Sequence, residues 1–167
     1  PPAAPAVATD GMTPEHRAQI ERGATIYREL CFECHGEDGR GEPLAGGAPG
    51  ATMAPALAGS PRVQAHRDYV IKTLLHGLTG PVGDRTYAQV MIPMGQQTDE
   101  WIADVGSYVR NAFGNSATFI SPEDVARVRE ASGTRSSMWT VDEIATTLPV
   151  ALQAEPSWVV TASHNND

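Results

Sequence analysis

The sequence predicts an all-α protein whose helices are joined by long irregular loops. Several segments carry apolar residues at helical spacing, and no segment before residue 149 alternates apolar and polar residues as a strand does. The 16 glycines and 13 prolines among 167 residues indicate many ordered turns. A chain of this length can build one domain with a sizeable core and still has room for an appendage.

Charge and hydropathy exclude two classes of protein. The 12 basic and 20 acidic residues give a formal net charge of −8, which disfavours binding to nucleic acid. No apolar run is long enough to cross a membrane, so we expect no transmembrane segment. The chain opens with prolines and alanines rather than a charged segment and an apolar run. We expect that any export signal has been removed or lies outside this sequence.

The first predicted helix follows a linker. Residues 1–11 are mostly Pro and Ala and offer too few large side chains to offset the entropy of ordering, so we expect a linker there. Thr13 as N-cap, Pro14 at the first position and Glu15 in the first turn predict a helix. We expect it to run to about Leu30 and to end at the two cysteines.

Two further helices are separated by irregular segments. Residues 36–60 contain seven glycines and three prolines without periodicity, which predicts a long loop that wraps around something. Residues 64–76 return to an apolar helical pattern, which Gly77 ends. After a second Gly- and Pro-rich stretch, Thr98 begins a helix that stops at Gly114.

The last third of the chain predicts a short helical extension over residues 116–148. Ser121 and Thr140 each stand three residues before an acid, which is the pattern of a helix start. Residues 149–167 differ in character, because Trp158 begins a run that fits the start of a strand. We interpret this stretch as a linker that leads into another domain.

The chemistry is concentrated in the motif C-x-x-C-H, formed by Cys31, Cys34 and His35. Two thiols on one helical turn can add to the two vinyl groups of a heme, while the adjacent His reaches the iron. A zinc site needs about four ligands, and the sequence has no second cysteine pair. A thioredoxin-like motif would follow a strand rather than close a helix. We therefore predict one covalent heme c, with a structural disulfide as the main remaining alternative.

The second axial ligand is expected among the methionines. Met91 and Met94 lie in a Gly- and Pro-rich stretch before a helix, and Met91 follows His35 by 56 residues. A thioether on such a loop suits a sixth ligand carried across the heme. The two methionines cannot both bind the iron. Met91 is favoured, and Met94 either packs against the ring edge or takes the role itself.

Residues 12–115 resemble a class I cytochrome c. Gly23 and Tyr27 precede the first cysteine by eight and four residues, and Val105 and Tyr108 have the spacing of the contact pair on that family's last helix. The resemblance implies a close crossing of the first and last helices, where a glycine permits backbone approach. It also implies a fold of helices and long loops wrapped around one heme.

Further positions match the ligand pattern of this family. Pro55 lies in a segment that resembles its Pro-x-Leu loop, in which the proline carbonyl accepts the Nδ1 proton of His35. Gly95 follows Met91 by four residues, as a glycine follows the axial methionine in the family. Ile92 departs from the commoner bacterial form, in which a proline comes directly after the methionine.

Other side chains are candidates for contact with the heme or its propionates. Tyr87 is included among the expected cofactor-binding residues, and Arg85, Trp101 and Arg110 are further candidates. For each of them, packing on the surface or in the core is an equally good interpretation.

A narrower resemblance covers nearly the whole chain. Residues 76–81, 108–115 and 123–140 look like the cytochrome c domains of large planctomycete-type multidomain proteins. In those proteins the heme domain is fused to, or encoded beside, dehydrogenase-like domains for sugars or alcohols. Residues 158–165 resemble the opening of a discoidin-like carbohydrate-binding domain. The resemblance implies an excised domain whose partner is a redox protein or a fused dehydrogenase domain.

The inferred ligands predict an electron carrier rather than an enzyme. An iron held by His35 and Met91 has no open site for a substrate, so we expect one-electron transfer from a sugar or alcohol dehydrogenase. The alternative is a heme protein whose methionine dissociates, which would act as a peroxidase or bind gas ligands. Since heme attachment in bacterial cytochromes of this type follows export, we expect a periplasmic or otherwise extracytoplasmic location.

Overall fold

The computed structural model describes residues 7–149, and within them the chain forms helices and loops without a strand. The predicted all-α class is confirmed for this part of the chain. Single backbone bridges join some of the loops. The candidate strand at Trp158, the discoidin-like ending and the first six residues of the expected linker lie outside the described residues. In chain order, the elements are α1 (Pro14–Ile26), the π-helical turn η1 (Tyr27–Cys31), α2 (Phe32–His35), α3 (Pro61–Gln64), α4 (Arg67–His76), α5 (Asp99–Asn111), α6 (Pro122–Ala131) and α7 (Val141–Thr146).

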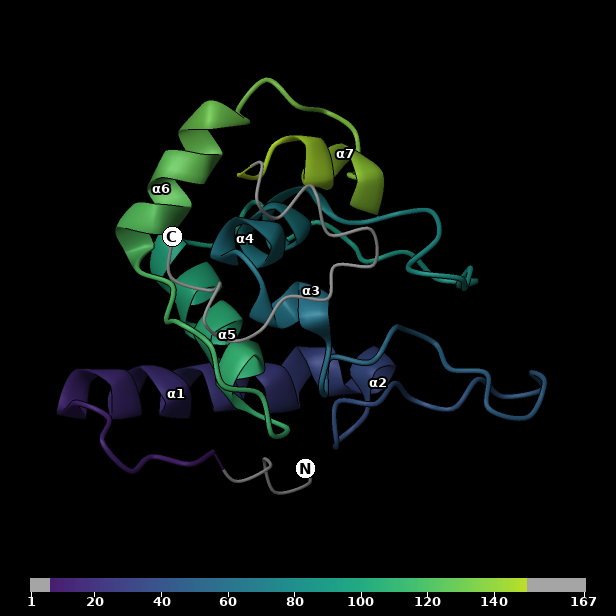
Figure 1. The fold of residues 1–167 in the computed structure, drawn as a ribbon, viewed down its shortest axis with the longest axis horizontal. Helices are drawn as coiled ribbons and strands as arrows, with labels where there is room; N and C mark the ends of the chain where they lie inside the picture. Colours follow the sequence, from purple (N-terminus) through teal and green to yellow (C-terminus); the bar gives the residue numbers. More distant parts are fainter. Residues whose placement is uncertain (1–6, 150–167) are drawn as a thin grey trace.

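Helices α1 and α5 cross at close range and form the frame of the fold (Figure 1). A Cβ atom on Gly23 would lie 2.6 Å from Tyr108 Cβ and would overlap the carbonyl oxygen of Asp104. Only a glycine therefore permits this approach. The rings of Tyr27 and Tyr108 fill the adjoining volume, with centroids 5.4 Å apart. The helix crossing that the sequence implied is confirmed.

The first helix continues further than the sequence indicated. Instead of ending near Leu30, it passes through η1 and α2 to His35, and Gly36 ends it at φ 73°. The hydroxyl of Tyr27 donates a hydrogen bond of 2.7 Å to the Gly36 carbonyl oxygen. Because a π-helical turn takes up an extra residue, the cysteine motif stays helical while its side chains turn relative to those of α1.

The helix predicted over residues 64–76 is present as α4, but it begins three residues later than expected, at Arg67, and a separate short helix, α3, precedes it. Arg110 is fully buried and donates hydrogen bonds of 2.7 and 2.8 Å to the carbonyl oxygens of Val63 and Ala65. Both carbonyl oxygens therefore accept hydrogen bonds from a charged side chain of α5. His66 then begins α4 as its N-cap, because its Nδ1 accepts the backbone N–H of Asp68.

Four predicted helix starts are confirmed, the first at Thr13, whose hydroxyl accepts the backbone N–H of His16. The side chains of Thr98, Ser121 and Thr140 each accept a hydrogen bond from the backbone N–H three residues later. At Ser121 and Thr140 the acid at that position also bonds back to the backbone N–H of the cap, which completes a capping box. Local sequence alone therefore determines where α5, α6 and α7 begin.

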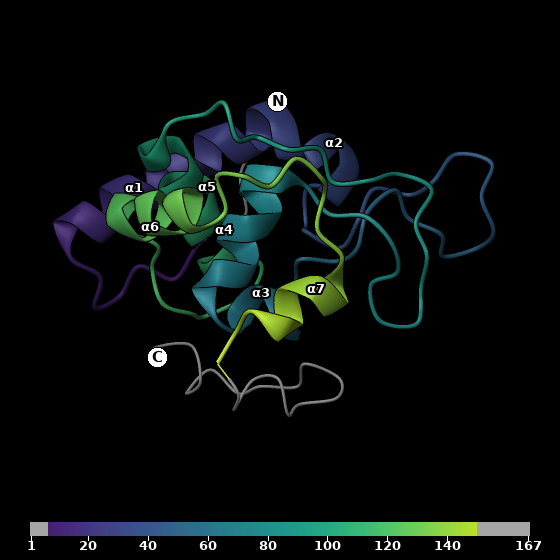
Figure 2. The same ribbon diagram turned by 90° about the horizontal axis from the view of Figure 1, so that it is seen from above.

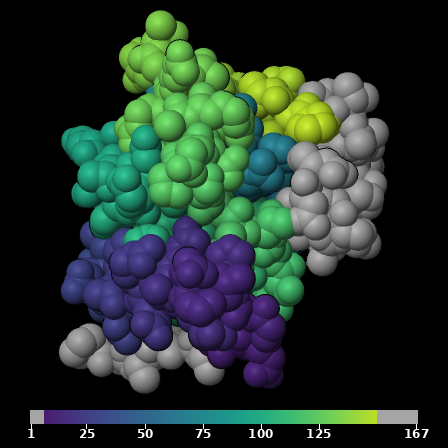
Figure 3. Space-filling view, turned by 90° about the vertical axis from the view of Figure 1, so that its left-hand side faces the viewer, coloured from purple at the N-terminus to yellow at the C-terminus, as the bar shows by residue number. Residues whose placement is uncertain are grey.

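Helices α6 and α7 pack against α4 and α5 instead of standing apart from them (Figure 1). In Figure 3, α6 (green) lies directly above α1 (purple) on one face of the molecule. The extension shares one apolar core with the preceding helices, so it contributes to the same burial of surface from water. Its buried core residues are Ile120, Val125, Val128, Trp139, Val141, Ile144 and Leu148.

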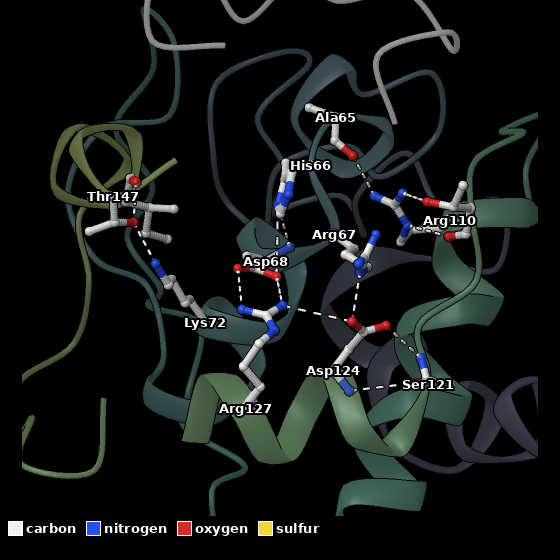
Figure 4. Close-up of polar contacts among 12 residues, drawn as sticks. Ala65, His66, Arg67, Asp68, Lys72, Arg110, Ser121, Asp124, Arg127 and Thr147 are labelled. Atoms are coloured by element: carbon white, nitrogen blue, oxygen red, sulfur yellow. Dashed lines mark hydrogen bonds and ion pairs between the residues drawn. The ribbon is translucent and has the colours of Figure 1, made fainter. Parts of the chain in front are cut away.

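Charged side chains also fasten the extension to α4 (Figure 4). Arg127 of α6 makes a two-pronged pair with the carboxylate of Asp68, at 2.6 and 3.0 Å. Lys72, the only lysine of the sequence, is buried, and its Nζ donates to the hydroxyl of Thr147. Burial is the largest cause that lowers the pKa of Lys72, while Asp68 opposes it. The last helix is therefore held by both apolar and polar contacts.

Two long loops, residues 37–60 and 77–97, extend to the same side of the helices (Figures 1 and 2). The first spans the Gly- and Pro-rich segment that predicted a loop, and the second spans the segment with Met91 and Met94. The space beside them holds the candidate site.

Replacing Gly23 with alanine should destabilise the protein by about 2 kcal/mol, because the added Cβ overfills the contact with α5. Urea denaturation of the variant measures this loss. Glu21→Ala, at an exposed position of the same helix, is the matched control and should stay within about 0.5 kcal/mol of the wild type. Equal effects of the two substitutions would contradict the importance of the crossing.

The stability of the protein should depend on the protonation of His66. Burial lowers the pKa of His66 below its ordinary value of 6.5, with Asp68 opposing the shift. The folded protein thus keeps this imidazole neutral at a pH where the unfolded chain protonates it. This contribution to stability is fully present above pH 6.5 and is lost as the pH falls below that value.

The free energy of unfolding should therefore decrease below pH 6.5, by at most about 1.4 kcal/mol per pH unit for this group. His66→Asn keeps an N-cap acceptor but cannot titrate, so its pH dependence should be shallower. The pKa of His76 is lowered in the same direction by burial, so some slope should remain. An unchanged slope in His66→Asn, measured by urea denaturation at several pH values, would disprove the assignment.

Candidate functional site

An apolar cavity that opens to solvent lies between α2, the helices α3 to α5 and the loop of residues 77–97. Buried side chains of α4 and α5, among them Val70, Leu74 and Val105, form its inner wall. Concave sites with a mainly apolar lining and a few polar groups are typical of sites that hold small molecules or cofactors. The full lining is Cys31, His35, Pro55, Ala56, Leu57, Ser60, Arg62, Val63, Tyr69, Val70, Thr73, Leu74, Leu78, Val82, Met91, Val105 and Val109.

A second cavity shares four lining residues with the first: Cys31, His35, Pro55 and Met91. Its remaining lining comes from the cysteine turn and the two long loops. These residues are Leu30, Glu33, Cys34, Met53, Ala54, Gln89, Val90, Ile92 and Met94. The four shared residues stand where the two spaces meet, so one large ligand could occupy both.

The rim of the second cavity is apolar and faces solvent. Leu30, Val90 and Ile92 are large apolar side chains with exposed fractions of 41%, 44% and 55%, and all three line this cavity. Exposed apolar groups gathered at one opening are typical of a contact surface or a ligand entrance. The sequence-based interpretation did not single out this rim.

Cys31, the last residue of η1, and Cys34, within α2, are both free thiols in the structure. Burial is the main cause that raises the pKa of Cys31 to about 12, with a smaller contribution from Cys34. Such a thiol does not ionise near neutral pH, whereas a thioredoxin-like redox centre needs a thiolate. The environment of Cys31 is therefore that of an attachment or structural residue rather than a redox thiol.

His35 is oriented by Pro55. Its Nδ1 lies 3.3 Å from the Pro55 carbonyl oxygen. Because a carbonyl can only accept a hydrogen bond, Nδ1 carries the proton and Nε2 keeps its lone pair. Desolvation lowers the pKa of His35, which favours the neutral imidazole that metal ions bind. The proline thus fixes both the tautomer and the direction of the ring.

Met91 and Met94 are distinguished by their surroundings. Met91 lines both cavities, whereas Met94 lines only the second. Met91 exchanges two backbone hydrogen bonds with Leu78, of 2.9 and 3.0 Å, and the backbone N–H of Met94 donates to the Leu74 carbonyl at the last turns of α4. Both methionines therefore lie on a loop whose backbone is hydrogen-bonded to α4 and to Leu78, near the start of the same loop.

Several other candidates do not come together with these residues. Tyr87 is half-buried in the second loop but lines neither of the two cavities. Arg85 and Trp101 also stand outside both linings, and Arg110 is fully buried with its guanidinium bonded to carbonyl oxygens of the protein. Their chemistry alone gave no means of telling which would face a cofactor.

Arg62 and Thr73, which the sequence-based interpretation missed, line the first cavity. Among the described residues, Arg62 Nε and Thr73 Oγ1 are buried without a hydrogen-bond partner. Unpaired buried polar atoms are costly, so a ligand that satisfies them is expected. A heme has an apolar ring and two propionate carboxylates, and the lining fits such a group. The one available signal was the Ser60 cap followed by Pro61, which begins α3 and places Arg62 on its first turn.

Two features are absent from the described residues: a cluster of metal-binding side chains and a membrane-spanning helix. Across residues 7–149, no three His, Cys, Asp or Glu side chains gather where they could hold a metal ion. No helix in the described region is long and apolar enough to span a membrane.

Comparison with known proteins agrees with this geometry. The model of the Cytochrome c family matches residues 20–113. The chain is 30% identical over 113 residues to the gluconate 2-dehydrogenase cytochrome c subunit of Pantoea cypripedii, a match that covers 66% of this chain and 24% of the relative. It is 29% identical over 117 residues to the fructose dehydrogenase cytochrome subunit of Gluconobacter japonicus, covering 64% and 22%. The chain thus spans about a quarter of the length of these relatives.

Gly77 at the base of the second loop should be sensitive to substitution. A Cβ atom there would lie 2.5 Å from the Met91 carbonyl oxygen, and φ is 78°. Gly80 has nearly the same φ, 81°, but its Cβ would meet nothing closer than 3.7 Å. Gly80→Ala should therefore cost only about 1 kcal/mol of backbone strain, whereas Gly77→Ala should cost about 2 kcal/mol more. Similar losses in urea denaturation would contradict the close contact with Met91.

Proposed function

This chain belongs to the cytochrome c family, and from that premise we propose that it carries single electrons on one covalently bound heme c held by His35 and Met91. Family membership and the all-α fold establish a heme-bearing domain for electron transport. The observation that carries the finer proposal is the meeting of Cys31, His35 and Met91 at the junction of two cavities. The sequence contains one C-x-x-C-H motif, which is the reason for proposing one heme.

Each residue at the junction has a proposed role. Cys31 and Cys34 attach the cofactor through thioethers, and His35 presents Nε2 while Pro55 accepts the proton on Nδ1. Met91 would supply a thioether ligand to the heme iron, and Met94, which lines the second cavity, would lie beside the cofactor. When bound, the heme iron alternates between the ferric and ferrous states. The apolar walls favour the ferrous state because it carries less charge.

Arg62 and Thr73 are proposed to receive a propionate. Both have buried polar atoms without a protein partner in the described region, and the guanidinium would neutralise the carboxylate. Tyr87 stays a candidate for an outer contact with the cofactor, although it lines neither cavity. The heme domain is proposed to cover residues 12–115, with residues 116–148 as its helical extension.

Electrons are proposed to come from a dehydrogenase that oxidises a sugar or an alcohol. The names of the two relatives describe cytochrome subunits of gluconate and fructose dehydrogenases. The donor would be a separate subunit or a fused domain, as in the planctomycete-type proteins that the sequence resembles. It would dock at the apolar rim of Leu30, Val90 and Ile92, next to the cysteine turn. The proposed location is the periplasm or another extracytoplasmic space.

Absorption spectra of the purified holoprotein test the ligand assignment. A ferric heme with a thioether ligand has a weak far-red band, so Met91→Ala should abolish this band and Met94→Ala should retain it. The reduction potential of Met91→Ala should fall, because loss of the thioether removes a ligand that favours the ferrous state.

Two other results would replace this assignment. Loss of the band only in Met94→Ala would identify Met94 as the ligand. Absence of the band in the wild type, together with rapid CO binding after reduction by dithionite, would mean an open iron. The protein would then be a peroxidase or a gas-ligand binder instead of an electron carrier.

A further inference from the structure

We propose that α6 and the segment that follows it form a clamp on the loop of residues 77–97, and that this clamp determines how readily Met91 leaves the iron. The proposal rests on the proposed function, because it takes Met91 as the axial ligand. The clamp residues are Arg129, Arg135 and Trp139, which all lie beyond residues 20–113, the part matched by the cytochrome c family. They are therefore positioning residues added to the family's core.

Arg129 of α6 holds the end of the loop. Its guanidinium donates hydrogen bonds to the carbonyl oxygens of Gly95 and Gln97, the latter at 2.8 Å. It also pairs with the Asp99 carboxylate at 2.8 Å. These partners begin four residues after Met91 and continue into the first turn of α5. One side chain thus ties the loop to both α5 and α6.

Trp139 holds the start of the loop. Its backbone N–H donates to the Gly77 carbonyl at 3.1 Å, and its carbonyl accepts from the Thr79 N–H at 2.8 Å. Between these two contacts, Leu78 pairs with Met91 on its other side. Three backbone segments therefore lie side by side: the segment that links α6 to α7, the start of the loop at Leu78, and the part of the loop that carries Met91. Figure 2 shows the first of these segments running beside the loop that follows α4.

Arg135 holds the segment that links α6 to α7 in place. Its guanidinium lies 3.5 Å from the centre of the Trp139 ring and donates to the Met138 carbonyl at 2.8 Å. It also pairs with Glu143 of α7 at 2.9 Å. The segment that links α6 to α7 therefore cannot move without breaking the contact between Arg135 and α7. Met91 is thus held on a loop whose two ends are both anchored in α6 and its linker.

Such anchoring affects the equilibrium between bound and dissociated methionine. Met91 can leave the iron only if its loop moves, and the clamp raises the free energy of that open state. An external ligand binds only to the open state, so its apparent affinity falls with the population of that state. Loosening the clamp should therefore strengthen binding of an external ligand without any change at the iron itself.

Arg127 provides the matched control on the same helix. It stands two residues before Arg129, but its guanidinium pairs with Asp68 of α4 and with Asp124, away from the loop (Figure 4). Arg127→Gln and Arg129→Gln remove the same charge from α6. Only the second removes contacts to the loop that carries Met91.

The test is titration of the ferric holoprotein with imidazole, followed in the visible spectrum. Arg129→Gln should bind imidazole at least tenfold more tightly than the wild type, and Arg127→Gln should stay within twofold. Arg135→Gln should shift the affinity in the same direction as Arg129→Gln, because it frees the other end of the loop. Arg135→Gln also serves as the test if Arg129→Gln does not fold.

The outcomes separate this proposal from the ligand assignment. Equal imidazole affinities in Arg127→Gln and in both loop variants would overturn the clamp, while a far-red band lost only in Met91→Ala would leave the ligand assignment standing. Conversely, if Met91→Ala binds imidazole no more tightly than the wild type, Met91 is not the ligand that imidazole displaces. That result overturns the ligand assignment and the clamp together.

Discussion

The contact between α1 and α5 at Gly23 is the constraint on which the rest of the molecule depends. It brings the two backbones together so closely that Asp104 and Tyr108 occupy the space of a missing side chain. Helix α1 runs on from this point through the π-helical turn into the cysteine motif. On the other partner, Val105 and Val109 of α5 face the cavity. Gly23 thus sets the distance between the cysteine motif and the cavity wall that α5 forms.

Local signals in the sequence were sufficient for much of the fold. Helix starts at Thr98, Ser121 and Thr140 depend on a side chain and a backbone group three residues apart, so they can be read directly. The cysteine motif is equally local. The start of α4 is different, because the carbonyls just before it bond to Arg110, which lies 45 residues along the chain from Ala65. Residues 61–66 carry no pattern that would indicate a hydrogen bond from an arginine so far along the chain.

The sequence was sufficient to propose the attachment and ligand residues of the candidate site, but not the other residues that line its cavities. His35, Pro55 and Met91 belong to recognisable patterns, and the structure brings all three to one place. Arg62 and Thr73 belong to no pattern, since an arginine after a proline or a threonine in a helix is common on any surface. What singles them out is burial without a partner, which is a property of the folded chain alone. The clamp residues of α6 and of the segment after it were missed for the same reason: capping boxes predict where a helix begins but not what it covers.

The placement of Lys72 has a consequence for identifying the redox partner. The sequence has one lysine, and it lies beneath α7 with its ammonium group bonded to Thr147. Cross-linkers directed at amines therefore find no exposed lysine side chain on this protein. Carboxyl groups are abundant, with 20 acidic residues and a formal charge of −8. Coupling through carboxylates is accordingly the chemistry that can capture the proposed redox partner on this surface.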